Sequence, residues 1–409
     1  MMSKEKRRVP KLRFPGFTED WEQRKFGEIM TFLNGRAYKQ DELLGAGKYK
    51  VLRVGNFYTN DSWYYSNLEL DDKYYAMNGD LLYTWSATFG PHIWKGEKVI
   101  YHYHIWKLVL QDKIDKLFAL QLLEVDKANI MSDKNGSTMV HITKQGMENK
   151  QTILPISLNE QKQIAKFLSS MDKVITLHQR KLDKLQATKK ALLQEMFPEE
   201  GQDKPKRRFK GFTDAWKQRK LSELATMNAR IGWQNLRTSE FLDSGDYLLI
   251  TGTDFDNGRI KYSTCHYVEK KRFDQDTKIQ LSTGSILITK DGTLGKVALV
   301  EELPKPATLN AGVFNVRVKD DAFLSYKYLY HYLKAPFSMK YVTANATGGT
   351  IKHLNQSILV DFPIPIAEKH EQDKITKLLD SLESIITLHQ RKLDKLKNLK
   401  QAYLNEMFV

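Results

Sequence analysis

The side chains of this 409-residue chain that are best suited to chemistry are short polar residues and glycines placed directly after apolar runs. Such segments occupy 53–56, 79–90 and 136–138 in the first half of the chain, with counterparts at 250–253, 284–295 and 348–350 in the second half. Hydroxyls and bare backbone N–H groups suit phosphate contacts, while Arg, Asn and Lys can read base edges. An ordinary turn is the competing interpretation of each segment.

We predict that polar and basic side chains in or near these segments contact DNA. Ser86 and Thr88 differ in type from Lys290, Asp291 and Thr293 in the second half, which suits two domains that read different sequences. The predicted DNA-binding residues are Arg36, Arg53, Asn56, Ser86, Thr88, Ser137, Thr138, Arg230, Thr253, Lys290, Asp291, Thr293, Thr350 and Lys352.

The sequence carries no catalytic signature. It lacks a phosphate-binding loop ending in Lys-Ser/Thr, a G-x-G-x-x-G turn, the H-E-x-x-H and G-x-S-x-G motifs, and an Asn/Asp-Pro-Pro-aromatic tetrad. The acidic pairs 71–72 and 199–200 lie in turn-like or linker contexts. Cys265 is the one cysteine, so neither a disulfide nor a thiolate zinc cluster can form within the chain. We therefore expect no catalytic residue, no metal site and a reducing, cytoplasmic compartment.

The charge balance favours a polyanionic partner. The chain has 64 Lys and Arg against 49 Asp and Glu, which gives a net charge of +15. Nucleic acid is the first candidate and an acidic membrane surface the second, while an inert basic surface is the alternative. The N-terminal segment 1–14 is charged with no apolar stretch behind it, so we expect a flexible arm rather than a signal peptide. No run reaches the ~18 apolar residues of a membrane span.

Aromatic residues cluster at 63–65, at 74–75 and at Tyr101 and Tyr103. Base-stacking platforms are built from such residues. Core and cross-strand packing is the commoner use of neighbouring aromatics, and we favour it here.

Eleven consecutive residues, ITLHQRKLDKL, occur at 175–185 and again at 386–396, an offset of 386 − 175 = 211. Near the N-terminus, RFPGFTEDWEQRK at 13–25 matches RFKGFTDAWKQRK at 208–220, with an offset of 208 − 13 = 195. Solenoid repeats are roughly 20 to 50 residues long, so this period indicates a duplicated domain. The matching ends of each copy enclose a middle that varies in length and sequence.

The C-terminal part of each copy predicts a long helix. From Asn159 to Phe197 there is no Pro or Gly, and apolar residues alternate at spacings of four and three, the 3.5-residue period of a coiled coil. A helix of this length spans ~58 Å and could act as a ruler. Polar residues 178, 189, 389 and 400 interrupt the seam and could fix its register. The predicted packing residues are Ile164, Leu168, Met171, Ile175, Leu182, Leu185, Ile375, Leu379, Leu382, Ile386, Leu393 and Leu396.

The middles, about 26–155 and 221–366, show the short alternating apolar runs of strands. The clearest strand signals lie at 81–85, 99–110, 247–255, 285–290 and 312–318, and helical stretches lie at 116–129 and 323–334. We read each middle as one strand-rich domain that also contains helices.

These motifs together resemble the specificity subunits of type I restriction-modification systems. The resemblance rests on RFPGF-x-x-x-W (13–21) and RFKGF-x-x-x-W (208–216), on the helix starts at 158–172 and 371–383, on the shared ITLHQRKLDKL, and on the closing EMF at 195–197 and 406–408. It covers essentially the whole chain. The second helix start, 363–372, departs by being a few residues longer than the first, 155–161.

The resemblance implies an α+β fold with two target-recognition domains and two spacer helices packed as an antiparallel coiled coil, related by a pseudo-two-fold axis. The expected domains are residues 1–157, with 1–12 as the flexible arm, and 201–366. The expected spacer helices lie within 158–200 and 367–409. Each domain would read one half-site of duplex DNA from a major groove, with half-sites ~34 Å apart.

The resemblance also implies partners. Two modification subunits, which carry the adenine methyltransferase activity, would dock on the helices and recognition domains, and restriction subunits would add the ATP-dependent translocase and endonuclease. S-adenosylmethionine, ATP and Mg would bind to these partners, and this chain would hold no cofactor. A stand-alone methyltransferase would need the missing motifs. A coiled-coil adaptor without specific DNA readout is the other alternative, and it would bind DNA by charge alone.

Overall fold

The computed structural model describes residues 9–58, 60–86, 88–132, 142–199, 201–232, 235–346 and 353–409. The chain divides into two compact units, and each is built from segments far apart in sequence. Unit 1 contains Met1–Gln179 together with Arg391–Val409, and unit 2 contains Arg180–Gln390. The division therefore passes through both long helices. The helix ends belong to the two units because they pack into the domain cores.

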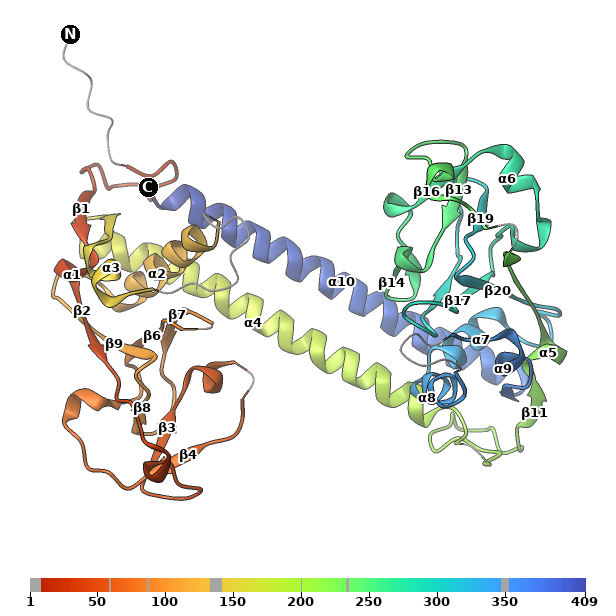
Figure 1. The fold of residues 1–409 in the computed structure, drawn as a ribbon, viewed down its shortest axis with the longest axis horizontal. Helices are drawn as coiled ribbons and strands as arrows, with labels where there is room; N and C mark the ends of the chain where they lie inside the picture. Colours follow the sequence, from red (N-terminus) through yellow and green to blue (C-terminus); the bar gives the residue numbers. More distant parts are fainter. Residues whose placement is uncertain are drawn as a thin grey trace, which may run out of the picture. The chain divides into compact units, whose positions relative to one another are not determined.

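In the described residues, unit 1 holds two four-stranded sheets and one two-stranded sheet. Figure 1 labels several of their strands. The first four-stranded sheet has the order β2 (Met30–Asn34), β9 (Ile105–Leu110), β6 (Leu81–Thr84), β7 (Gly90–Ile93) and is antiparallel throughout. The second has the order β4 (Tyr64–Ser66), β3 (Tyr49–Leu52), β8 (Val99–Tyr101), β5 (Tyr75–Ala76), and β3 runs parallel to β8. The short sheet pairs β1 (Glu22–Lys25) with β10 (Gln151–Leu154).

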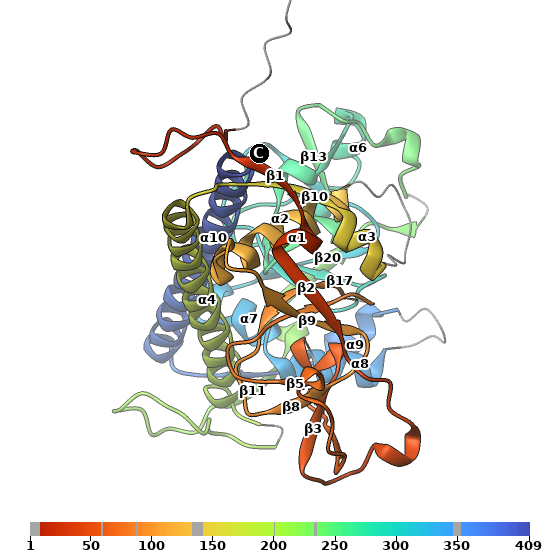
Figure 2. The same cartoon turned by 90° about the vertical axis from the view of Figure 1, so that its left-hand side faces the viewer.

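Besides its parts of the two long helices, unit 1 has three α-helices in the described residues. They are α1 (Phe26–Ile29), α2 (Lys116–Ser132) and α3 (Lys144–Asn149), and α1 lies beside β1 and β2 (Figure 2). The helix α2 packs on β7 and buries its apolar residues in the main core of the unit. The predicted helix at 116–129 and the strands at 81–85 and 99–110 are present, with 99–110 divided into β8 and β9 by a tight turn.

Unit 2 repeats most of this topology. Its four-stranded sheet has the order β12 (Ala225–Ala229), β20 (Val313–Val318), β17 (Ile286–Thr289), β18 (Val297–Leu299). Its second sheet, β16 (His266–Val268), β13 (Tyr247–Ile250), β19 (Ala307–Leu309), again contains one parallel pair, β13 with β19. Two short pairs complete it, β11 (Lys217–Lys220) with β21 (Pro363–Ile366) and β14 (Phe255–Asp256) with β15 (Arg259–Ile260). The helices are α5 (Leu221–Leu224), α6 (Lys270–Asp274), α7 (Tyr326–Leu333), α8 (Pro336–Asn345) and α9 (Gln356–Val360).

The two long helices are α4 (Leu158–Glu195) and α10 (Lys369–Met407). The second begins 369 − 158 = 211 residues after the first. This offset equals that of the repeated ITLHQRKLDKL, so both helices begin at the same distance from that sequence despite the longer loop before α10. In unit 1 the start of α4 packs against the end of α10, and in unit 2 the start of α10 packs against the end of α4. Each unit thus contains an antiparallel pair of helix segments, as the α+β prediction required.

The predicted seam residues fall into two groups by burial. Ile164 and Leu168 of α4 lie in the main core of unit 1, and Ile375 and Leu379 of α10 lie in that of unit 2, so the first turns of each helix pack into a domain as well as against the other helix. The buried members are Ile164, Leu168, Met171, Leu182, Ile375, Leu379, Leu382 and Leu393. The partly buried members are Ile175, Leu185, Ile386 and Leu396.

Candidate nucleic-acid interface

Three loops of the first domain meet at one edge of its two larger sheets. Because β3 and β8 are parallel, with Leu52 opposite Tyr101, the residues that follow both strands lie at the same edge. The antiparallel pairing of Thr84 with Ile105 brings the end of β6 to this edge as well. The structure therefore places the predicted segment 53–56 beside the end of β6, within the predicted segment 79–90, and beside the turn 102–104.

Asn56 closes the first of these loops. The Arg53 N–H donates to Asn56 Oδ1 at 3.0 Å, and Asn56 Nδ2 donates to the carbonyls of Asn60 and Ser62 at 3.0 and 2.9 Å. The Arg53 guanidinium lies over the Tyr64 ring, 4.2 Å from its centroid. The Asn56 amide thus positions the loop, and the half-buried Arg53 donates from Nη2 to the carbonyl of Ser62 at 3.2 Å.

The other predicted residues of this edge are held by local contacts. Arg36 forms two hydrogen bonds with the Glu42 carboxylate, at 3.0 and 2.7 Å. Tyr58 Oη lies 3.1 Å from His92 Nε2 and donates to the Thr88 carbonyl at 3.5 Å, which ties the loop of Ser86 and Thr88 to the loop after β3. These contacts fix the shape of the edge before any ligand binds.

The second domain brings its loops together in the same way. The Thr251 N–H donates to Asp254 Oδ2 at 2.8 Å, which orders the turn that carries Thr253. This turn packs so closely on the end of β17 that a Cβ at Gly252 would lie 2.9 Å from a methyl carbon of Thr289. Lys290 directly follows that strand, and its N–H donates to the carbonyl of Gly312 at 2.9 Å.

The loop after β17 also engages the segment that precedes α9. His353 Nδ1 lies 2.7 Å from Asp291 Oδ1, and the Leu354 N–H donates to the Lys290 carbonyl at 3.0 Å. The Thr293 carbonyl accepts a hydrogen bond from Thr289 Oγ1. Four of the predicted residues of this domain, Thr253, Lys290, Asp291 and Thr293, therefore lie on neighbouring loops at one edge.

The prediction for Arg230 disagrees with the structure. Its side chain is 2% exposed, and it donates from Nε to the Leu309 carbonyl at 2.8 Å and from Nη2 to Thr308 Oγ1 at 3.3 Å. Burial lowers the pKa of this guanidinium. Arg230 joins β12 to β19 and cannot reach a base edge from this position. Ser137, Thr138, Thr350 and Lys352 lie outside the described residues.

A buried ion pair at each helix start was missed at the level of sequence, although both of its segments were recognised as motifs. In unit 1, Arg13 donates from Nε and Nη2 to the two oxygens of Glu160 at 2.6 and 2.8 Å, and Trp21 Nε1 donates to Glu160 Oε1 at 3.3 Å. The Glu160 side chain is 1% exposed. The neighbouring Gln161 donates from Nε2 to the carbonyls of Lys113 and Pro155 at 3.0 and 2.9 Å.

Unit 2 contains the same arrangement. Arg208 donates to the two oxygens of Glu371 at 2.7 and 2.9 Å, and Trp216 Nε1 donates to Glu371 Oε2 at 3.0 Å. The sequence signal was available, because Arg and Trp eight residues apart precede each helix that begins with Glu-Gln as its third and fourth residues. The motif R-F-x-G-F-x-x-x-W therefore fastens each domain to the start of its own helix.

The end of the other helix completes each junction. The Leu12 N–H donates to the Glu406 carbonyl at 2.9 Å in unit 1, and the Arg207 N–H donates to the Glu195 carbonyl at 2.8 Å in unit 2. The Phe408 ring meets Trp21 edge-on at 6.4 Å, and Phe197 meets Trp216 in the same way. The repeated EMF thus lies at the end of each long helix, where that helix packs against the domain of the other copy.

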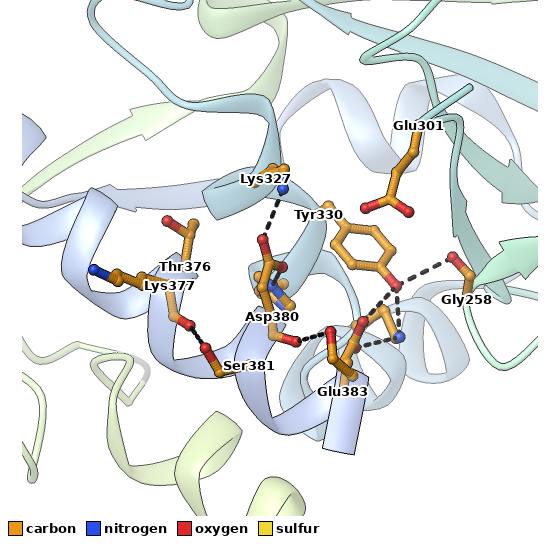
Figure 3. A network of polar contacts seen from close by, with 12 residues as sticks. Gly258, Glu301, Lys327, Tyr330, Thr376, Lys377, Asp380, Ser381 and Glu383 are labelled. Carbon is orange, nitrogen blue, oxygen red and sulfur yellow. Dashed lines mark hydrogen bonds and ion pairs between the residues drawn. The ribbon is translucent and has the colours of Figure 1, made fainter. Parts of the chain in front are cut away.

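Two of the polar seam residues form ion pairs within their units. Lys189 Nζ lies 2.5 Å from Glu383 Oε1 in unit 2, and Lys400 Nζ lies 2.6 Å from Asp172 Oδ1 in unit 1. Glu383 belongs to a larger network, part of which is drawn in Figure 3. Lys334 also donates to Glu383, at 2.8 Å. A charge on a seam matched by one partner in the facing helix favours a single register.

Figure 3 also shows Asp380, one turn before Glu383 on α10. Asp380 pairs with Lys327 at 2.8 Å and with the buried His331 at 2.8 Å. Burial alone would raise the pKa of Glu383, but the cations of Lys334 and Lys189 outweigh it and hold that pKa at about 2. Burial lowers the pKa of Lys334 to about 8.

Among the described residues, no three His, Cys, Asp or Glu side chains are grouped closely enough to hold a metal ion. Within the same part of the chain, no helix combines the length and apolar character needed to cross a bilayer.

Comparison with known proteins adds two kinds of finding. A family model described as type I restriction modification DNA specificity domain matches residues 18–187 and 213–398, one copy in each half. The fold resembles that of the type I restriction-modification system S subunit from M. genitalium, with a TM-score of 0.64 at 15% identity, over 98% of this chain and 99% of that one. At this identity the likeness concerns the fold.

Two relatives are similar along most of their length. The MjaVIII specificity subunit of Methanocaldococcus jannaschii is 24% identical over 95% of this chain and 92% of its own length. The EcoBI specificity subunit of Escherichia coli is 20% identical over 95% of this chain and 86% of its own length. The matches thus extend across both copies and both helices.

Proposed function

This chain belongs to the family of type I restriction modification DNA specificity domains, and from that premise we propose that its two domains each read one half of a split site in duplex DNA. The observation that carries the proposal is the pair of equivalent loop edges. Both edges are built on equivalent strands, yet Trp85 and Ser86 follow β6 where Lys290 and Asp291 follow β17. One scaffold with different side chains at its edge suits the reading of two different half-sites.

The helices in this proposal set the distance between half-sites and receive the partner subunits. Leu177 and Leu388 are equivalent, since 388 − 177 = 211, and they are 66% and 63% exposed. Val174 and Ile385, one turn earlier on the same face, are also exposed. Each helix thus carries the same exposed apolar stripe, and lysines follow it. Such a surface fits an amphipathic helix with acidic flanks, and its repetition fits two copies of one partner.

The partners are two modification subunits and the restriction subunits, acting in the cytoplasm. Methyl transfer to adenine, with S-adenosylmethionine, takes place on the modification subunits. The ATP- and Mg-dependent translocase and nuclease activities lie on the restriction subunits. This chain is the non-catalytic member that selects the site. Its excess of basic residues favours DNA through phosphate contacts, and binding should weaken steeply as salt rises.

The test is to sequence modified bases in cells with and without this chain while the modification subunits are kept. We expect a methylated two-part motif that disappears when the chain is removed. Exchanging residues 217–366 for those of a relative should change one half of the motif and leave the other. An unchanged methylation pattern in cells without the chain would contradict the proposal and favour an adaptor that does not read DNA.

A further inference from the structure

The turn between β8 and β9 consists of three consecutive rings, His102, Tyr103 and His104. Tyr101, which precedes them, is fully buried, whereas Tyr103 is 38% exposed. Core packing therefore accounts for the first tyrosine of this pair but not for the second. Tyr103 lies at the loop edge of the first domain, next to the loops that carry Arg53 and Ser86.

The backbone of this turn is fixed from three sides. The Tyr103 N–H donates to the Arg36 carbonyl at 3.0 Å, and the Tyr103 carbonyl accepts from Trp85 Nε1 at 2.8 Å. The His102 N–H donates to the Leu52 carbonyl at 2.9 Å. A side chain on such a support loses little conformational entropy when it binds, which is how rigid aromatic anchors gain affinity.

A continuous set of ring contacts connects the turn to the core. Trp85 lies edge-on to His104 at 5.0 Å and stacks on Trp106 at 5.7 Å, and Trp106 stacks in turn on the buried Tyr83 at 5.8 Å. The rings of His104 and His102 lie 3.9 and 4.4 Å from the centre of the Tyr103 ring. Both imidazoles are tilted against the Tyr103 ring, which is 38% exposed, so part of the ring edge is what Tyr103 offers to a ligand.

This tip is uncharged at neutral pH. Burial lowers the pKa of His102 to about 4, and it also lowers the pKa of His104. None of the described residues makes a hydrogen bond to the Tyr103 hydroxyl. A neutral tip carries no charge that would draw it to a phosphate, whereas the guanidinium of Arg53 in the neighbouring loop carries one. The tip is therefore suited to the groove and its flank to the backbone.

The equivalent turn of the second domain, which lies within the described residues, carries no aromatic ring. This turn, between β19 and β20, has the same length, 310–312, and holds Ala311 where the first domain has Tyr103. Lys290 and Asp291 are the larger side chains of that edge. A ring contact at this position would therefore act on one half-site only.

We propose that Tyr103 determines specificity in the first domain by placing its ring edge against the 5-methyl group of a thymine in the major groove. The thymine methyl is the apolar feature of the major-groove code, and apolar side chains read it by contact. The inference rests on the proposed function, because it assumes that this edge faces duplex DNA. It adds that the first half-site contains an A·T pair that is recognised by a contact with an uncharged side chain.

The experiment uses the chain in complex with its modification subunits. Tyr103→Ala should make one A·T position of one half-site degenerate, while the other half and the spacing stay unchanged. Affinity for the intact site should fall about tenfold, within the range for one specific base contact. Tyr103→Phe keeps the ring and should keep the motif. Phe323→Ala, which removes a comparably exposed ring from the second domain, should alter neither half-site.

A second measurement changes the DNA instead of the protein. Deoxyuridine in place of that thymine should weaken the wild-type complex about as much as Tyr103→Ala does, and should not weaken the variant further. A motif that keeps every position in Tyr103→Ala overturns the inference, as does an equal deoxyuridine penalty in variant and wild type. Failure of the proposed function looks different, because the wild-type complex would then direct no two-part modification.

Discussion

Arg13 and Glu160, 147 residues apart, are joined by two hydrogen bonds of 2.6 and 2.8 Å, and Glu160 is almost completely buried. Arg208 and Glu371 repeat this pair in the second copy. The segment before each domain is thereby fixed to the helix that follows the domain. A domain whose two ends are fastened in this way can vary its loops without changing where its helix begins.

Removal of one residue from the buried ion pair should lower the stability of the fold. Arg13→Ala leaves the Glu160 carboxylate buried without its counter-charge, and we expect a loss of ~3–5 kcal/mol in the free energy of unfolding. Arg208→Ala should have the same effect in the second unit. The measurement is urea denaturation followed by circular dichroism.

The matched control is the double variant Arg13→Met with Glu160→Met. A buried apolar pair of similar volume needs no counter-charge, so the double variant should be more stable than either single one. Lys48→Ala, which breaks an exposed pair with Glu69, should change stability little. Equal losses for Arg13→Ala and Lys48→Ala would contradict the role given to the buried pair.

The network around Glu383 predicts an acid-sensitive unit 2. The pKa of Glu383 is about 2 in the folded chain, against an ordinary value of 4.5. The folded state then holds its proton less tightly than the unfolded state does, so this carboxylate stabilises the fold above pH 4.5. That contribution should be lost as the pH falls from 4.5 to about 2.

Glu383→Gln tests this dependence. The variant leaves Lys189 and Lys334 without their shared carboxylate, so it should be clearly less stable than wild type at pH 7. The difference should shrink between pH 4.5 and 2, as measured by urea unfolding across that range. The exposed Glu69→Gln serves as the control. A difference that stays constant with pH would argue against the role of this carboxylate.

The elements of this fold could be predicted where periodicity decides them, and the contacts between loops could not. The seam at Leu168 or Leu379 follows from spacing alone, because a helix places every third and fourth residue on one face. Arg230 was assigned to the DNA-binding residues because the sequence around a basic residue after a strand does not show whether its side chain faces solvent or is buried against a neighbouring strand. The pairing of Arg13 with Glu160 needed tertiary structure, since no local pattern links residues so far apart.

The exposed apolar stripe on the two long helices predicts which substitutions should weaken binding of the modification subunits. Leu177→Asp and Leu388→Asp place charges on exposed positions, so the stability of the chain should change by no more than ~0.5 kcal/mol. Each variant should weaken association with the modification subunit, and the double variant should abolish it. Co-purification and titration calorimetry measure the association. Met131→Asp, equally exposed but on α2, is the control that should bind normally.

The length of the two long helices should determine the distance between the two half-sites in the DNA. One extra heptad in each of α4 and α10, placed after Leu185 and Leu396, adds ~10 Å to each helix and keeps the seam in phase. Half-sites about three base pairs further apart are then expected, with unchanged half-site sequences, because the domains themselves are not altered. Modified-base sequencing measures both quantities in one experiment.

The same insertion in α4 alone is the informative control. Lys189 would move by two turns relative to Glu383, so the ion pair and the seam beyond it would be broken. Leu182→Asp and Leu393→Asp, at buried seam positions, should likewise uncouple the domains and abolish modification at both spacings. If the double insertion still methylates sites of the original spacing, then the helices do not measure the gap. The distance would in that case be set by the bound partners or by the DNA itself.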